Sequence, residues 1–115
     1  QRAKAAVGAG IAALTAVAGL PLAALQRVVV AGLFGRYLDV ANAQAIGLLP
    51  AVPASRIELV GNTAAAGATA LLLSTQAQTM ADRLRQQARL INMAHRPEFE
   101  DAFLEHLYLR PTEAN

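Results

Sequence analysis

The sequence predicts an α/β fold in which a short, mostly parallel sheet is flanked by helices. Three runs of aliphatic residues, at 28–30, 57–60 and 90–93, have the length and composition of strands. Segments with helical periodicity precede, separate and follow these runs. Because strands that alternate with helices are typical of parallel sheets, this order favours an α/β layer with at least two parallel strands over a helical bundle.

The composition predicts one domain with an aliphatic core. The chain has 115 residues, of which 55% are hydrophobic and only 4% aromatic, and Trp is absent. This length suits one modest core and is too short for two ordinary domains. Because the chain begins with Gln1 and enters a helical pattern at once, we expect a further part of the protein to lie upstream.

The charge and the cysteine count argue against several classes of site. Ten basic residues against eight acidic ones leave a formal net charge of +2, which is too small an excess to indicate nucleic-acid binding. Since the chain has no Cys, it carries no disulfide, thiolate metal site or iron–sulfur cluster of its own. His95 and His106 stand far apart and do not form a zinc pattern.

Residues 2–18 predict a buried or half-buried helix. Its larger apolar residues recur at spacings of four and three: Val7, Ile11, Leu14 and Val17. Gly19 is expected to end the helix, and Pro21 follows where a helix cannot continue. A short helical turn is expected at 22–26.

The uncharged stretch at 5–25 has about the length of a bilayer span. Nearly half of it is Ala, Gly19 and Pro21 interrupt it near one end, and no second span follows. Since such a segment is only weakly driven to insert, we predict no membrane span.

Residues 28–35 predict a strand that leads into a glycine turn. Three consecutive Val residues are typical of a central strand buried on both faces. The turn contains Gly32 and Gly35, and an Ala-rich helix is expected to follow at 40–46.

The run at 57–60 predicts a second strand, which also ends in a glycine turn, at Gly61. Asn62 or Thr63 is expected to cap a helix that runs to about residue 87 with a break near Ser74. The second half of this helix has one apolar face: Leu73, Ala77, Met80, Ala81, Leu84 and Ala88.

The last third predicts a third strand at 90–93 and a helix that starts at Pro97, because Pro favours the first helical position. Acidic residues occupy the first turn of that helix: Glu98, Glu100 and Asp101. Its buried stripe is expected to contain Phe99, Phe103, Leu104 and Leu107. Residues 111–115 are expected to form a loose tail.

The two strand-to-glycine junctions, at 28–35 and 57–63, are the candidate ligand sites. In open α/β sheets, ligands bind beyond the carboxyl ends of the strands, and both junctions are expected to point the same way. Glycine allows the backbone to approach a ligand closely, and the following N–H groups can face an anion or a ribose. The alternative is that both are ordinary tight turns.

No catalytic constellation is predicted. Ser55 and Ser74 have no His nearby in the sequence, and His95 lacks a positioned partner. The acids at 98–101 are explained by the helix dipole rather than by metal binding. Three arginines form either a solvated helix face or a contact surface for a partner: Arg83, Arg85 and Arg89.

Several short strings, taken in order, resemble the C-terminal segment of the ferredoxin-linked ATPases that reductively activate corrinoid proteins. The strings are VVVAGLFG at 28–35, YLD at 37–39, NA at 42–43, IGLLP at 46–50, VGNTA at 60–64, GA at 67–68, LLLS at 71–74, and PEF at 97–99 with Phe103. They cover the chain from about residue 2 to residue 111. Asn92 and Met93 depart from the family, which often has Glu at this point.

The resemblance implies a fold and a nucleotide site. That family belongs to the acetate kinase, sugar kinase, Hsp70 and actin superfamily, in which ATP lies between two lobes built on ribonuclease-H-like sheets. It implies that residues 1–115 form a single C-terminal subdomain fragment of the second lobe of an actin-like ATPase. The implied nucleotide-binding residues are Gly32, Leu33, Phe34, Gly35 and Lys4. The implied pocket border consists of Gly61, Asn62, Thr63 and Gly67.

The resemblance also implies the cofactors and partners of a larger, cytoplasmic parent protein. The cofactors are ATP with magnesium and a two-iron two-sulfur cluster. The phosphate loops, the acids that hold the metal and the ferredoxin domain that holds the cluster would lie upstream. The implied partner is the corrinoid protein of a methyltransferase system, whose cobalt is reduced from Co(II) to Co(I). The chain would also contact its own upstream domains, and a homodimer stays open.

Two alternative functions stay open. One is a lobe of another ATPase or small-molecule kinase of the same superfamily, which would keep the adenosine turn and act on a different substrate. The other is a non-catalytic interaction domain that associates through its Ala-rich helix.

Overall fold

The structure is a computed structural model that describes residues 1–112, apart from the side chains of Phe34 and Ala94. The regular elements are, in order, α1 (Arg2–Ala18), β1 (Val28–Ala31), α2 (Val40–Ala45), β2 (Ile57–Gly61), α3 (Thr63–Leu73), α4 (Thr75–Gln87) and α5 (Pro97–Glu105). Short 3-10 turns lie at Leu22–Ala24, Phe34–Tyr37, Ala54–Arg56 and Met93–His95. The predicted α/β class is confirmed.

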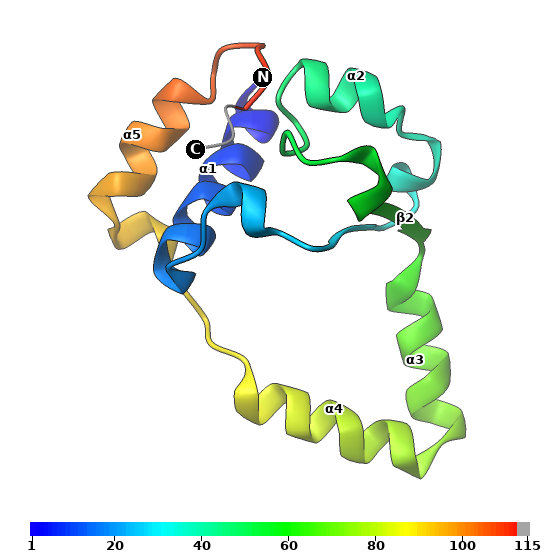
Figure 1. Ribbon diagram of the computed structural model, residues 1–115. Coiled ribbons are helices and arrows are strands. Elements are labelled where there is room, and N and C mark those ends of the chain that lie inside the picture. Colours follow the sequence, from blue (N-terminus) through cyan, green and yellow to red (C-terminus); the bar gives the residue numbers. More distant parts are fainter. Residues whose placement is uncertain (113–115) are drawn as a thin grey trace.

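Two helices that are far apart in the sequence, α1 and α5, pack side by side (Figure 1). Small residues make this close approach possible, since Ala5, Gly8 and Ala9 are buried on α1. Gly19 ends α1 as predicted, in the left-handed conformation with φ 65°, and Pro97 occupies the first turn of α5.

The sheet consists of β1 and β2, which pair in parallel with Val28 opposite Ile57 and Val30 opposite Leu59. The register shifts between Val30 and Ala31, so that Ala31 pairs with Gly61. At the start of the sheet, the Arg27 guanidinium donates two hydrogen bonds of 2.7 Å to the Glu58 carboxylate. The hydrogen bonds from Arg27 lower the pKa of the exposed Glu58 carboxyl.

The prediction of a central strand buried on both faces is wrong for β1. Within the described residues the sheet has two strands, and side chains along β1 alternate between half-buried and exposed. Consecutive β-branched residues favour extended backbone, but they do not determine how many strands lie beside it.

The predicted third strand at 90–93 is also absent from the described fold. Residues 88–92 have no regular structure, and a 3-10 turn follows at Met93–His95. Leu90 is 99% exposed, which shows that this apolar run does not enter the core. A short apolar run becomes a strand only where another strand offers its edge, and β1 and β2 lie elsewhere (Figure 1).

Helices α3 and α4 form an arm that extends away from the rest of the molecule (Figure 1). The break between them falls at Ser74 as predicted, where the Ser74 hydroxyl accepts a hydrogen bond of 3.2 Å from the Ala77 N–H. None of the residues of either helix is buried. The arm explains why the radius of gyration is 15.8 Å, whereas a compact domain of this length has about 13 Å.

The apolar stripes of the last helices are less buried than their spacing predicts. Phe99 and Phe103 on α5, and Leu107 just after it, are half-buried, but the expected core residue Leu104 is 56% exposed. On the arm, Leu73, Met80 and Leu84 are exposed. Spacing places side chains on one face, and only a neighbouring element can cover that face. In residues 1–112, no helix is long and apolar enough to cross a membrane.

Candidate functional site

Both glycine turns lie at the same edge of the sheet because β1 and β2 run parallel. Gly32 follows β1, and Gly61 is the last residue of β2. A short hydrogen bond of 2.6 Å, from the Gly32 N–H to the Gly61 carbonyl, joins the two turns. The sequence prediction that the turns point the same way is therefore confirmed, and together they form the candidate functional site.

Gly32 occupies a backbone conformation that other residues rarely adopt, with φ +108°. A Cβ added to Gly32 would meet no atom within 4 Å, so the space beside it is open. The side chain of the next residue, Leu33, is exposed. The turn thus presents bare backbone to solvent, which is the arrangement that permits close approach of a flat ligand.

Gly35 has a different role from Gly32. A Cβ added to Gly35 would lie 2.8 Å from the Cγ1 atom of Val30, and Gly35 is buried. The Gly35 carbonyl accepts a hydrogen bond of 3.1 Å from the Leu38 N–H, which closes the 3-10 turn onto the end of β1. Gly35 is therefore needed for packing, and Gly32 leaves the surface open.

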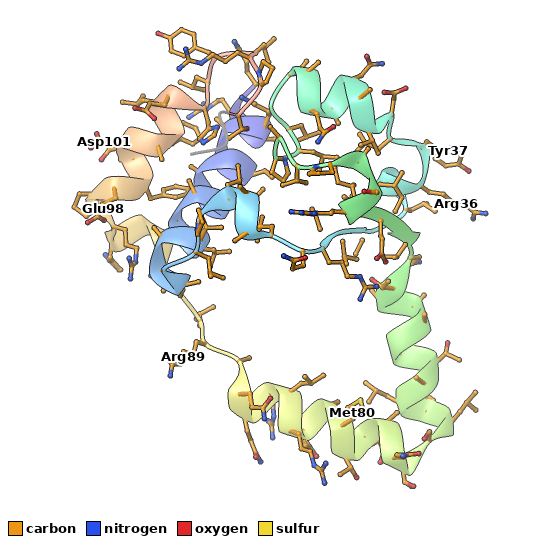
Figure 2. All side chains as sticks on the ribbon, in the orientation of Figure 1. Arg36, Tyr37, Met80, Arg89, Glu98 and Asp101 are labelled. Carbon is orange, nitrogen blue, oxygen red and sulfur yellow. The ribbon has the colours of Figure 1, made fainter. Side chains whose placement is uncertain are left out.

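Arg36 and Tyr37 are two candidate contact residues that the sequence reasoning missed. Both project outward from the segment that follows the glycine turn (Figure 2), and Tyr37 is 83% exposed. A guanidinium plane and a phenol ring are the side chains on which a nucleobase stacks. The sequence feature that could have identified them is their position directly after a Gly-x-x-Gly turn.

The second turn combines an open glycine with a helix cap. Gly61 has φ +69°, and a Cβ added there or at Gly67 would meet no atom within 4 Å. The Asn62 side-chain oxygen accepts a hydrogen bond of 3.1 Å from the Ala65 N–H, and Thr63 is the first residue of α3. The predicted pocket border is thus an exposed edge, and its role in binding stays a prediction.

Replacing Asn62 with Ala is expected to lower the free energy of unfolding by about 1 kcal/mol, because the cap at the start of α3 is lost. Asn62→Asp keeps a side-chain acceptor and should restore most of that loss. The measurement is urea unfolding followed by circular dichroism. Equal stability of Asn62→Ala and the parent chain would show that α3 does not depend on this cap.

Lys4 lies apart from the glycine turns. Its side chain is only 6% exposed, and its ammonium donates hydrogen bonds of 2.8 Å to the His106 carbonyl and 2.7 Å to the Tyr108 carbonyl. Burial, and then the nearby charge of Arg110, lowers the pKa of Lys4. These bonds tie the start of α1 to the chain that leaves α5, so the geometry favours an anchoring role. Nucleotide binding by Lys4 stays a prediction.

The other charged residues singled out in the sequence lie on separate elements. Within the part of the chain that the structure describes, no group of three or more His, Cys, Asp or Glu side chains is close enough to hold a metal ion. Arg85 forms an exposed ion pair of 3.5 Å with Asp82, one turn away on α4, and Arg89 projects from the segment after α4 (Figure 2). Glu98 and Asp101 lie on the outer side of α5 (Figure 2).

Known proteins resemble this chain in sequence and in fold. The family model for the C-terminal ASKHA domain of RACo matches residues 1–115. The chain is 36% identical over 104 residues to the corrinoid activation enzyme RamQ of Eubacterium limosum, covering 90% of this chain and 18% of that protein. A solved structure of a reductive activator for a corrinoid iron–sulfur protein matches with a TM-score of 0.89 and 35% identity, covering 97% of this chain.

The chain spans 18% of the length of these relatives, so the likeness concerns one region of much longer proteins. The structural likeness extends over nearly all of this chain. It agrees with the two parallel strands and the flanking helices described above. The chain therefore belongs to the family of the RACo C-terminal domain, which is an ASKHA domain of the actin-like class.

Proposed function

We propose that this chain is the nucleotide-binding part of an ATP-dependent reductive activator of corrinoid proteins. The observation that carries the proposal is Gly32, which has a positive φ and open space beside it at the carboxyl edge of a parallel sheet. Membership of the RACo family adds the corrinoid context, since both relatives bear names that refer to corrinoid activation.

The residues present fit a nucleoside better than they fit the other implied cofactors. The Gly32 backbone, Arg36 and Tyr37 offer an open surface for a flat base. The chain has no Cys for an iron–sulfur cluster, and its acids do not gather in the described region. We therefore propose that the cluster, the magnesium ligands and the phosphate loops belong to other parts of a longer cytoplasmic protein.

ATP supplies, when bound, the free-energy difference that drives the protein between two states. The residues of this chain would favour the nucleotide-bound state through their contacts with the nucleoside. A ligand shifts such an equilibrium only by its differential affinity for the two states. In the nucleotide-bound state, the protein would bind its corrinoid partner in a complex that alters the environment of the cobalt. This complex would permit reduction of Co(II) to Co(I). The corrinoid protein of a methyltransferase system is the proposed partner, and association as a homodimer is compatible with this role.

The isolated chain is expected to hydrolyse no ATP above a blank without protein, because phosphoryl transfer needs phosphate-binding loops and a metal held by carboxylates. The longer protein is expected to hydrolyse ATP faster when its Co(II) corrinoid partner is added. The measurement is release of inorganic phosphate, with and without magnesium.

A second assay distinguishes the proposed function from that of a small-molecule kinase, which would keep the glycine turn. Candidate acceptors are added to the longer protein with ATP, and the products are separated by chromatography. Transfer of phosphate to a small acceptor, or magnesium-dependent turnover by the 115-residue chain alone, would contradict the proposed function.

A further inference from the structure

A cavity of about 390 Å³ lies where α1, the turn at 47–50 and the segment after α5 meet. This volume is at the lower end of the range for small-molecule sites. Its walls are largely apolar, with side chains from four segments of the chain: Ile11, Leu20, Leu22, Leu48, Pro50 and Pro111. None of residues 32–35 lines it, so it lies apart from the glycine turn. Of the residues that the family resemblance assigns to the nucleotide, Lys4 alone lines this cavity.

Three basic residues line this cavity: Lys4, His106 and Arg110. The Lys4 ammonium has three N–H donors, and the His106 and Tyr108 carbonyls accept two of them, which leaves one donor. Arg110 lies over the Tyr108 ring, with its guanidinium carbon 5.6 Å from the ring centre. Within residues 1–112, none of the three forms an ion pair with a carboxylate.

The charges around the cavity are not balanced. Burial and then the charge of Arg110 lower the pKa of Lys4. Burial, and then Lys4, lower the pKa of His106, while Glu105 opposes that effect and Arg110 adds to it. Because a lowered pKa favours the neutral His106 imidazole, the charged residues of the wall, among those that the structure describes, are Lys4, Arg110 and Glu105, which leaves an excess of one positive charge. One negative charge would neutralise it.

We propose that this cavity binds a small organic monoanion, a carboxylate with an apolar body. The carboxylate would accept hydrogen bonds from Lys4 and Arg110, and the body would lie against Ile11, Leu22 and Leu48. Because the walls come from both ends of the chain, an occupant would hold α1 and the C-terminal segment together. This proposal does not depend on nucleotide binding at the Gly32 turn.

The test titrates the isotopically labelled longer protein with phenylacetate and follows the backbone amide signals of residues 1–112 by NMR. Saturable shifts are expected at residues that line the cavity, such as Gly8, Thr15 and Gly47, with no comparable shifts at residues 32–35. Phenylacetamide, a neutral molecule of nearly the same shape, should bind at least about tenfold more weakly, since it lacks the charge-assisted hydrogen bonds.

Two variants, each with a matched control, test separately the positive charge and the free volume of the cavity. Arg110→Gln should weaken phenylacetate binding about tenfold, while Arg89→Gln, in the segment after α4 and outside the cavity lining, should not change it. Ala16→Leu places a larger side chain in the cavity and should abolish saturation, while Ala18→Leu, at the end of the same helix, should not. Equal binding of the acid and the amide, no saturable shift with phenylacetate, or unchanged affinity in both Arg110→Gln and Ala16→Leu would overturn the proposal.

Discussion

Replacing Gly47 with Ala is expected to lower the free energy of unfolding by about 3 kcal/mol, which is a large fraction of the stability of a chain of this size. Gly47 is buried and has φ +72°. A Cβ there would collide with the Arg110 carbonyl oxygen and would lie 3.1 Å from the Lys4 ammonium nitrogen. A left-handed conformation costs a residue with a Cβ about 1–2 kcal/mol, and overpacking adds about 1–3 kcal/mol.

Two other glycines serve as matched controls for this variant. Gly19→Ala meets the same backbone strain, with φ +65°, but no atom lies within 4 Å, so a loss of only about 1–2 kcal/mol is expected. Gly10→Ala, inside α1 with open space, should stabilise the chain by about 0.5–1 kcal/mol. The measurement is urea unfolding of all three variants. If Gly47→Ala is no less stable than Gly19→Ala, the turn at 47–50 does not lie against the C-terminal segment.

Replacing Gly32 with Val is expected to weaken ATP binding by the longer protein roughly a hundredfold, or about 2.8 kcal/mol. Val is β-branched and cannot adopt φ +108° without strain, so the turn must change shape. Its side chain would also fill the open space into which a nucleoside is proposed to fit. The measurement is isothermal titration calorimetry with ATP and magnesium.

The control for Gly32→Val is Gly10→Ala on α1, which adds a methyl group in open space without backbone strain. This variant should keep the ATP affinity of the parent protein. Circular dichroism checks that both variants are folded. A folded Gly32→Val protein with unchanged affinity for ATP would mean that the nucleoside does not contact this turn.

The helices and their ends were predictable because their signals are local. Gly19 and Pro97 mark helix ends through their own backbone geometry, and Ser74 and Asn62 cap helices whose N–H groups are three residues away. The two paired strands were predictable for a similar reason, since each is a short aliphatic run followed by glycine.

Burial was less predictable, because it depends on neighbours that the local sequence does not reveal. Residues 90–93 are apolar enough for a strand, yet no strand edge is available to them in the described fold. Leu104 and the apolar residues of α4 have helical spacing, but no element in residues 1–112 covers them.

The candidate site was predictable in part. Gly32 could be selected from the sequence because a glycine directly after a strand marks the edge where ligands bind. The cavity beside α1 could not, since its contacts join residues as far apart as Lys4 and His106, which are 102 positions apart. Lys4 was selected through family resemblance, and the structure shows an anchoring contact that its helix position alone did not suggest.

The visible spectrum of the corrinoid partner tests the proposed function most directly. The longer protein, with its iron–sulfur cluster reduced, is mixed with the Co(II) corrinoid protein in the presence and absence of ATP and magnesium. The proposal predicts that the Co(II) band is replaced by the Co(I) band only when ATP is present, and that Gly32→Val prevents this change at ATP concentrations that saturate the parent protein. Reduction to Co(I) that proceeds equally well without ATP, or no reduction with any corrinoid protein encoded beside it, would contradict the proposal.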